Sequence, residues 1–185
     1  AEGDRTTLDL LAALAPDLPE HFVITGPLGL TERLAPAYAA DWVIPHVKMR
    51  LAGDRDLPPA DPRVTWLERE AADEVVALRD TGGDASAFFI PSLLDTGYYG
   101  GIRLDGGLAA VAGVHVLSER YGVAAMGNVL THPGHRRRGL ARALTATLAR
   151  RLLDTVPVVG LNVGTANAGA RALYDGLGFV PVITY

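Results

Sequence analysis

The stretch HPGHRRRGLARAL sets three consecutive arginines, Arg136, Arg137 and Arg138, directly before an apolar helical pattern. Free N–H groups at the start of a helix, together with the positive end of the helix dipole, form a ready binding site for an anion. Gly139 lets the backbone approach a phosphate closely, and the small Ala141 leaves room for it in the first turn. The arginines add charge and forked donors. The stretch therefore predicts a cradle for a phosphorylated ligand, with a solvated basic helix end as the alternative.

Motifs for other chemistries are missing from the chain. The nearest imitation of a P-loop, GTANAGAR, has Ala170 and Arg171 where Lys and Ser or Thr are required. Neither a GxGxxG turn after a strand nor a GxSxG elbow occurs. The absence of cysteine excludes disulfides, thiolate metal sites and a cysteine nucleophile. No HExxH motif is present, and the close pair His132 and His135 lies in a Pro-Gly turn, so no metal site is predicted.

The first third of the chain carries weaker patterns. Residues 8–15 are predicted to form a short helix, and HFVITG a short strand. In DWVIPHVKMRLAG, the apolar residues Val47, Met49 and Leu51 alternate with polar ones, which predicts a strand. Pro45 should confine that strand to an edge or a bulge. The polar, proline-rich GDRDLPPADP is typical of a connection.

From Val64 onward the patterns are clearer. VTWL predicts a short strand and EREAADEVVALRDTGG a helix closed by glycine, after which three strands are joined by turns at 105–107 and 118–122. A helix over 135–153, a buried strand VVGLNV, a helix over 167–176 and a final strand FVPVITY complete the chain. This order predicts a mixed α/β sheet, and the length of 185 residues favours a single domain.

Two motifs in this part resemble the GNAT acetyltransferase superfamily. RRRGLA, with Arg136, Gly139 and Ala141, matches the R/Q-x-x-G-x-G/A pyrophosphate loop of that superfamily. About 30 residues further on, NAGARALYDGLGF resembles its second motif. The residues at the characteristic places of the second motif are Asn167, Ala170, Tyr174, Gly178 and Phe179. The resemblance covers residues 64–185 as an acyltransferase core and leaves residues 1–60 as an N-terminal elaboration of the single domain, with no assigned role.

The resemblance implies the GNAT fold, which is a central, mostly antiparallel mixed sheet with flanking helices and one splayed pair of parallel strands. Those two strands would be GNVLTH and VVGLNV, with an acyl-CoA co-substrate between them. Its pantetheine amides would pair with backbone near Val129 and Leu130, and its pyrophosphate would lie on the amides of residues 137–141, including Leu140. Arg137 stands where the loop usually has glycine, so its side chain either adds a phosphate contact or points outward.

Two residues of the second motif acquire roles from the same resemblance. Asn167 would contact the pantetheine arm or order the loop, and it equally suits an N-cap of the helix that follows. Tyr174 would be the general acid that protonates the departing CoA thiolate, with a core aromatic beside Leu173 and Leu177 as the alternative.

The lack of cysteine favours direct transfer, because no thioester intermediate can form on the protein. An amine would then attack the thioester in a ternary complex, while the enzyme supplies positioning, an N–H for the oxyanion and proton transfers. Many relatives place a glutamate base on the strand before the loop, but AAMGNVLTHP has none. Asn128 could hold a base water, and His115 on the neighbouring strand could act as the base unless it is a satisfied core residue.

The segment SAFFIPSLLDTGYYGG is expected to line the acceptor site, although most of its aromatic residues would equally well pack the core. The candidates are Phe88, Phe89, Asp95, Tyr98 and Tyr99.

Composition limits the partners. Hydrophobic residues make up 49% and charged residues 21% of the chain, as in an ordinary globular protein. No apolar run reaches the length of a membrane span, and the acidic start broken by proline is unlike a signal peptide, so a cytoplasmic location is expected. The net charge of −4 makes a basic-helix nucleic-acid binder the weakest hypothesis.

The sequence therefore predicts an acyl-CoA-dependent N-acetyltransferase that acts on a primary amine of a small molecule or peptide. No nucleic-acid or membrane partner is expected, and homodimerisation is left open. A rival from another class is a non-catalytic acyl-CoA-binding or sensing module. The missing glutamate favours this rival, whereas the retained Tyr174 disfavours it.

Overall fold

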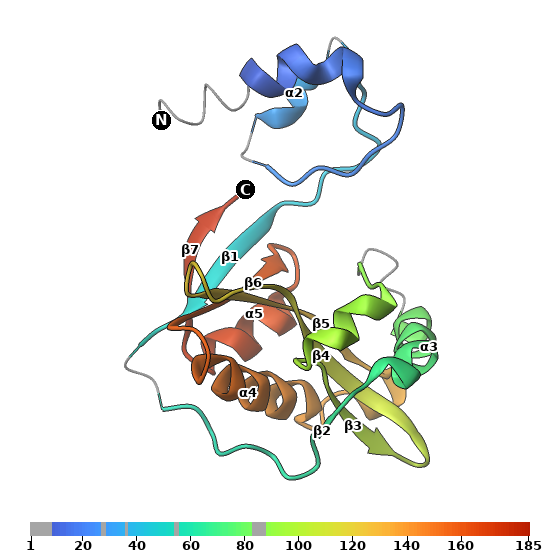
Figure 1. Ribbon diagram of the computed structural model, residues 1–185, viewed down its shortest axis with the longest axis vertical. Helices are drawn as coiled ribbons and strands as arrows, with labels where there is room; N and C mark the ends of the chain where they lie inside the picture. Colours follow the sequence, from blue (N-terminus) through green and yellow to red (C-terminus); the bar gives the residue numbers. More distant parts are fainter. Residues whose placement is uncertain (1–8, 27–28, 36, 54–55, 83–87) are drawn as a thin grey trace.

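The computed structural model describes residues 9–26, 29–35, 37–53, 56–82 and 88–185. Figure 1 shows a helical N-terminal segment set apart from the main body, which it joins through an arm made of strands β1 and β7. The strands are β1 (His46–Leu51), β2 (Thr65–Trp66), β3 (Gly100–Leu104), β4 (Gly107–Ser118), β5 (Val123–Thr131), β6 (Val158–Gly164) and β7 (Phe179–Thr184). The α-helices are α2 (Leu30–Leu34), α3 (Ala72–Gly82), α4 (Leu140–Leu153) and α5 (Ala168–Asp175), and residues 9–14 are also helical. The 3₁₀ turns are η1 (Ala15–Asp17), η2 (Arg69–Ala71), η3 (Pro91–Thr96) and η4 (Pro133–His135).

The strands form one seven-stranded sheet in the order β2-β3-β4-β5-β6-β1-β7. Every neighbouring pair is antiparallel except β5 and β6, which run parallel. A parallel pair needs a long crossover connection, and α4 supplies it between these two strands. The predicted fold class, a mixed and mostly antiparallel sheet with flanking helices and one parallel pair, is confirmed.

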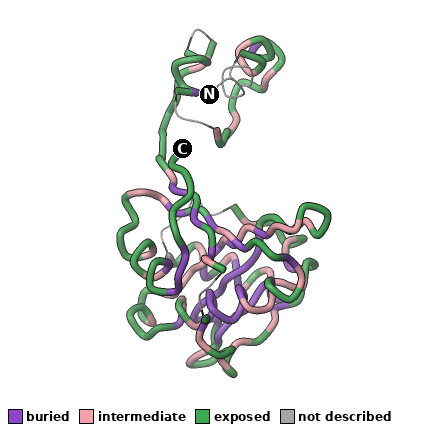
Figure 2. Tube along the Cα trace, turned by 90° about the vertical axis from the view of Figure 1, so that its left-hand side faces the viewer, coloured by how far each residue is buried: buried purple, intermediate pink, exposed green. Residues whose placement is uncertain are grey.

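The helices divide between the two faces of the sheet. On one face, α4 and α5 close the main core, to which α4 contributes leucines spaced four residues apart: Leu140, Leu144, Leu148 and Leu152. Burying each such side chain contributes about 1.5–3 kcal/mol. On the other face, α3 and the turns η2 and η3 build a second core over β4 around Val75, Leu94 and Tyr99. Figure 2 shows that buried residues concentrate in this main body, whereas the N-terminal segment is mostly exposed.

Strand β1 lies inside the sheet, between β6 and β7, so the expectation that Pro45 confines it to an edge is wrong. Pro45 directly precedes the strand, so the N–H that proline lacks falls outside the ladder, and its carbonyl still accepts a hydrogen bond from the amide of Thr165. The predicted alternation is confirmed, since Val47, Met49 and Leu51 are all buried. A register shift between Lys48 and Met49 against β7 supplies the expected bulge.

Three other expectations need correction. HFVITG forms no strand, because no described strand lies beside it and Val23 is 75% exposed. Helix α4 begins at Leu140 rather than at residue 135, since η4 and a turn with two left-handed residues intervene. Strand β6 is buried on one face only: Val159 and Leu161 face the main core, whereas Asn162 is exposed.

The segment that follows β1 lies along α4 rather than forming a free linker. Leu57 is buried in the main core, and the Nε of Arg150 donates to the carbonyl of Pro58 over 2.6 Å. The amide of Asp61 donates to Oγ1 of Thr147 over 2.9 Å. In the N-terminal segment, a small cluster of Ala15, Leu30 and Leu34 forms a separate core. Among the described residues, no helix has the length and apolarity that crossing a membrane would require.

Candidate active site

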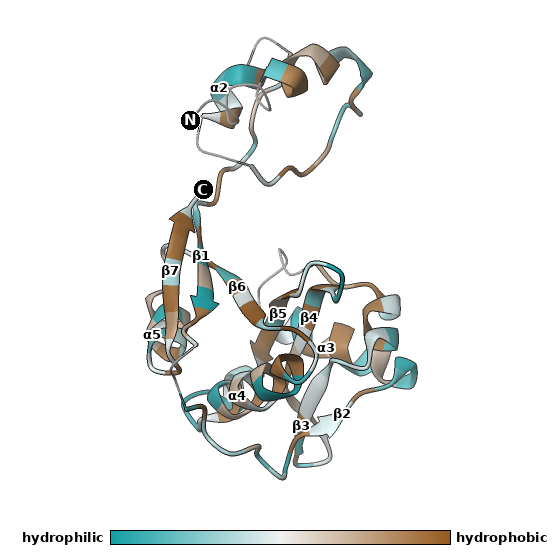
Figure 3. Cartoon of the chain, turned by 60° about the vertical axis from the view of Figure 1, so that its left-hand side comes forward, coloured by the Kyte–Doolittle hydropathy of each residue, from teal (hydrophilic) through white to brown (hydrophobic). Residues whose placement is uncertain are grey.

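The parallel strands β5 and β6 separate part-way along their length. They pair from Val123 opposite Val158 to Met126 opposite Leu161, and no pair follows, although both strands continue. Beyond Met126, the edge of β5 that faces β6 therefore has no strand partner. Figure 3 shows β6 running towards the β1–β7 arm, away from the end of β5. Backbone amides and carbonyls at such an opening are available to a ligand.

A bulge in β5 explains the separation. Between the pairs Gly113–Gly127 and Val111–Leu130, β5 advances one residue more than β4. The extra residue falls at Asn128, whose φ of 51° lies in the left-handed region. A bulge bends its strand and increases the local twist, which directs the end of β5 away from β6.

Two hydrogen bonds to the segment before β3 fix this bulge. The Nδ2 of Asn128 donates to the carbonyl of Phe88 over 3.0 Å and to Oη of Tyr99 over 2.9 Å. Asn128 is only 7% exposed, and its Oδ1 is buried with no partner among the described residues. Tyr99 is fully buried above Gly113, where its ring leaves no room for a Cβ. Burial raises the pKa of Tyr99 to about 12, although the hydrogen bond from Asn128 acts in the opposite direction.

The loop before α4 presents backbone amides to an open space. Arg137 has a φ of 58° and Gly139 a φ of 76°, so two left-handed residues flank Arg138. Turns of this kind bring successive N–H groups together into an anion-binding concavity. Gly139 is the N-cap of α4 and supplies no side-chain acceptor, and an added Cβ at that position would touch nothing within 4 Å. The first amides of α4 thus remain open for an anion.

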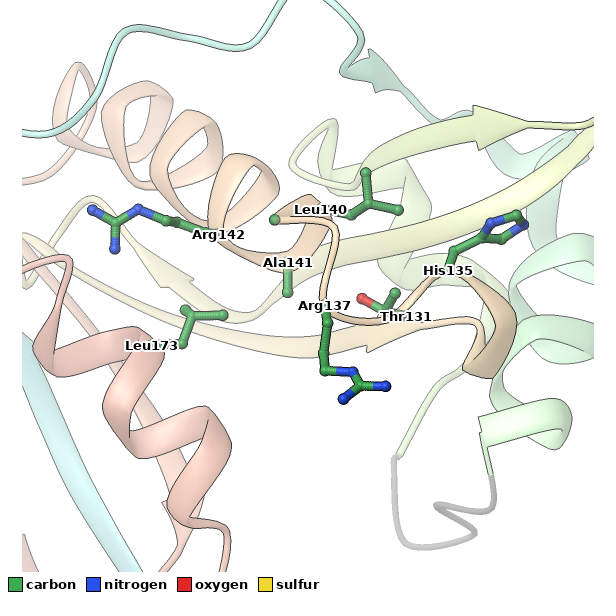
Figure 4. A pocket seen from close by; sticks show the side chains of 8 residues that line it. Thr131, His135, Arg137, Leu140, Ala141, Arg142 and Leu173 are labelled. Carbon is green, nitrogen blue, oxygen red and sulfur yellow. The ribbon is translucent and has the colours of Figure 1, made fainter.

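A pocket of about 300 Å³ lies in front of this loop, between the start of α4 and α5 (Figure 4). Its lining residues are Thr131, His135, Arg137, Gly139, Leu140, Ala141, Arg142 and Leu173. Four of them were predicted as ligand contacts from the sequence: Arg137, Gly139, Leu140 and Ala141. The other four, Thr131, His135, Arg142 and Leu173, were not predicted as ligand contacts, although Arg142 directly follows Ala141 and Leu173 directly precedes Tyr174.

The other two arginines of the loop bind protein groups. The Nε of Arg136 donates to the carbonyl of Thr131 over 3.3 Å, which ties the loop to the end of β5. The Nη1 of Arg138 lies 3.0 Å from Nδ1 of His135. Neither arginine lines the pocket, so Arg137 is the member of the triplet that faces the ligand space.

The second motif lies on α5 and around it. Asn167 is the N-cap of α5, and its Oδ1 accepts a hydrogen bond from the amide of Ala170 over 3.0 Å, as an N-cap requires. Tyr174 is 7% exposed and packs edge-on against Phe179, with the ring centroids 6.0 Å apart. Burial raises the pKa of Tyr174 to about 12, so its phenol carries a proton throughout the neutral range.

His115 is exposed rather than part of the core. It is the extra residue of a bulge in β4, because Val114 pairs with Met126 and Val116 with Ala125. Its ring lies against Gly127, where a side chain would collide with it. His115 therefore stands beside Gly127, the first residue of β5 beyond the last parallel pair.

The residues predicted to line the acceptor site do not lie together in one place. Phe88 is 63% exposed and reaches Asn128 through its carbonyl, whereas Phe89 packs against Tyr99. Tyr98 instead bonds Thr155 at the far end of α4, with 2.7 Å between the two hydroxyl oxygens. Asp95 forms an ion pair with Arg69 at 2.6 Å. Residues 86 and 87 of the predicted segment lie outside the described residues. In the part of the chain that the structure describes, no three His, Asp or Glu residues are grouped to hold a metal ion.

The model of the Acetyltransferase (GNAT) family matches residues 58–179, which include the β5 bulge, the arginine loop and α5. The chain belongs to the GNAT acetyltransferase family. Membership of this family implies acyl transfer from acyl-CoA. The resemblance to the GNAT superfamily that the two sequence motifs indicated is confirmed. No curated protein matches the sequence.

Solved GNAT structures share the fold. A GNAT-family acetyltransferase of Novosphingobium aromaticivorans superposes with a TM-score of 0.65 at 28% identity over 76% of this chain. This chain spans 61% of that protein. A GNAT acetyltransferase of Colwellia psychrerythraea has a TM-score of 0.63 at 13% identity, covering 96% of this chain and 69% of its own. The ribosomal-protein-S18-alanine N-acetyltransferase of Escherichia coli has a TM-score of 0.54 at 24% identity, covering 65% and 78%, respectively.

The two buried tyrosines predict a loss of stability at high pH. Tyr99 and Tyr174 have pKa values of about 12 in the folded chain, against 10.0 for an ordinary tyrosine. Below pH 10 both states keep these protons, and between pH 10 and 12 only the unfolded state releases them. The free energy of unfolding should therefore fall by about 1.4 kcal/mol per pH unit for each tyrosine. Chemical denaturation at pH 9 and pH 11 measures the loss, and Tyr174→Phe should remove half of it; an unchanged slope in that variant would refute the assignment.

Proposed function

We propose that this chain is an N-acetyltransferase that transfers the acetyl group of acetyl-CoA to a primary amine by direct attack in a ternary complex. The observation that carries the proposal is the opening between β5 and β6 beyond Met126 and Leu161, together with the amide-lined pocket at the start of α4. An extended, amide-containing arm suits the unpaired strand edge, and a pyrophosphate suits the open amides.

Residues of this chain fit the donor at both ends. The pocket offers the amides around Gly139 and the guanidinium of Arg137 to the phosphates, and the open space in front of Gly139 is where an anion would enter. The backbone of Val129 and Leu130, on the unpaired side of β5, would pair with the pantetheine amides. Asn167, through its capping bond, would hold the start of α5 beside the arm.

The transfer then needs two proton movements. The amine nitrogen attacks the carbonyl carbon of the thioester, a C–N bond forms, and the C–S bond breaks as the thiolate leaves. Tyr174 would donate its proton to the thiolate sulfur, a role for which its raised pKa keeps it protonated. The surplus amine proton would go to water or to the exposed imidazole of His115 beside Gly127. Since Asn128 uses both amide hydrogens to hold the bulge, only its Oδ1 would be left to orient a base water.

One observation favours the rival hypothesis of a non-catalytic acyl-CoA-binding module. None of the seven strands contains an aspartate or glutamate, so no carboxylate base projects from the sheet. A binding module needs the phosphate loop and the opened strand pair, but it does not need Tyr174 as an acid.

Release of free CoA thiol separates the two hypotheses. The chain is incubated with acetyl-CoA and a panel of primary amines, the thiol is followed with a chromogenic disulfide, and the acceptor products are identified by mass spectrometry with labelled acetyl groups. The proposal expects thiol release that depends on the amine and equals the N-acetylated product in amount. Tight acetyl-CoA binding in calorimetry, without amine-dependent thiol release, would establish the binding module instead.

A further inference from the structure

One face of the sheet is uncovered next to the opening between β5 and β6. Helices α4 and α5 cover the face that carries the main core, while α3 and η3 cover the opposite face over β4 and β5. On that opposite face, the described part of the chain places no helix over β6, β1 and β7 (Figure 3). Four cross-strand partners lie in one row on this face: Ala125 on β5, Gly160 on β6, Arg50 on β1 and Val180 on β7. The floor of the row is made of small residues, and Arg50 and Val180 are exposed.

The charged side chains that the described strands place on this face are all basic. Arg50 lies opposite Gly160 and Lys48 opposite Asn162, and both basic side chains are exposed. His115 lies on the same face, against Gly127. Because no strand contains Asp or Glu, neither Lys48 nor Arg50 has a carboxylate partner within the sheet. Lys48 is the single lysine of the chain, and its Nζ lies 5.8 Å above the ring of Tyr185.

The position of these cations relates them to the reacting centre. The last pair of the parallel strands is Met126 opposite Leu161, so the opening on β6 starts at Asn162, the partner of Lys48. Neighbouring strands are about 4.8 Å apart. Lys48 and Arg50 on β1 are therefore roughly 5–10 Å to the side of the opening, a gap that these long side chains and a short amino-carboxylate bridge together.

We infer that the acceptor carries a carboxylate close to its reactive amine, and that Lys48 and Arg50 bind this carboxylate. The inference rests on the proposed function and specifies its substrate class as amino acids or similar amino-carboxylates. With the carboxylate over β1, the amine of such an acceptor points back across β6 towards the opening, where His115 stands on the far side. Two exposed cations, on a face where the described strands carry no acidic residue, attract the carboxylate and leave the amine free to react.

The test compares matched acceptors that differ only in the carboxylate. The chain is assayed with α-amino acids, ω-amino acids and the primary amides of both, with thiol release and product mass as readouts. We expect amino acids to be acetylated with the higher kcat/KM. Lys48→Met and Arg50→Met should each lower kcat/KM for the amino acids roughly 10- to 100-fold, mainly through KM, as for one lost charge-assisted contact. The same variants should leave kcat/KM for the amides within about threefold, since the amides make no such contact.

Arg120→Met is the control, because Arg120 is an exposed arginine in the turn between β4 and β5, before β5 begins. It should change kcat/KM for neither acceptor class. Equal use of amino acids and amides, or an equal loss for both in Lys48→Met and Arg50→Met, would overturn the inference while leaving the N-acetyltransferase proposal intact. Absence of acetyl transfer to every acceptor, despite acetyl-CoA binding, would overturn both.

Discussion

Replacing Gly139 with aspartate should abolish the binding of CoA. Gly139 has a φ of 76° and caps α4 without a side-chain acceptor, so its backbone and the following amides form the floor of the pocket. A side chain in this conformation costs about 1–2 kcal/mol of backbone strain, and its Cβ would project into the open space in front of the amides. The aspartate charge would also lie where a phosphate must bind, beside like charge in a partly desolvated site. Isothermal calorimetry with CoA measures the loss.

Gly139→Ala separates the strain from the charge, because it adds the same Cβ without the carboxylate. It should weaken CoA binding much less than Gly139→Asp does. Arg137→Gly is a second comparison: it keeps the left-handed backbone at that position and removes the one guanidinium of the triplet that lines the pocket. The free energy of CoA binding to this variant should become less favourable by roughly 1.5–3 kcal/mol if one charge-assisted contact is lost. Unchanged CoA affinity in Gly139→Asp would place the donor site elsewhere.

The loop before α4 was predictable because its signals are local. A glycine at the N-cap, arginines before it and a helical pattern after it all fall within ten residues, and the structure has the loop and the helix in that order. The same holds for Asn167, whose capping bond reaches three residues along the chain. Only the start of α4 was predicted too early, because Arg137 adopts a left-handed conformation that is uncommon for arginine.

The environment of the opening was not predictable from local pattern. The bulge at Asn128 depends on Tyr99 and Phe88, which lie 29 and 40 residues away along the chain. The insertion of β1 between β6 and β7 depends on pairs such as Lys48 with Asn162, and the alternation in β1 says only that one face is buried. The exposure of His115 could not be predicted from the apolar sequence around it either. His115 is exposed because it is the extra residue of a bulge in β4 and because the helix layer on that face ends over β5.

Replacing Tyr174 with phenylalanine should lower turnover by roughly 10²- to 10⁴-fold, the range of a lost general acid. The substitution keeps the edge-on packing against Phe179 and removes only the hydroxyl, so the fold should survive and the acetyl-CoA dissociation constant should change little. The size of the loss depends on the leaving group, because an aliphatic thiol has a pKa near ~8.5 and its thiolate is a tolerable leaving group close to neutrality. Turnover of Tyr174→Phe should therefore recover in part as the pH rises towards that value.

Tyr98→Phe is the matched control, because the Oη of Tyr98 bonds Oγ1 of Thr155 at the far end of α4 from the pocket. This control should lose about 1 kcal/mol of stability and keep its turnover. If Tyr174 only packs the core, Tyr174→Phe should behave like this control, with a lowered melting temperature and near wild-type turnover. Steady-state rates and thermal melts on the same preparations distinguish the two roles, since a general acid moves kcat and a packing residue moves Tm. If Tyr174→Phe and Tyr98→Phe turn over equally fast, Tyr174 is not the general acid. Water would then protonate the departing thiolate.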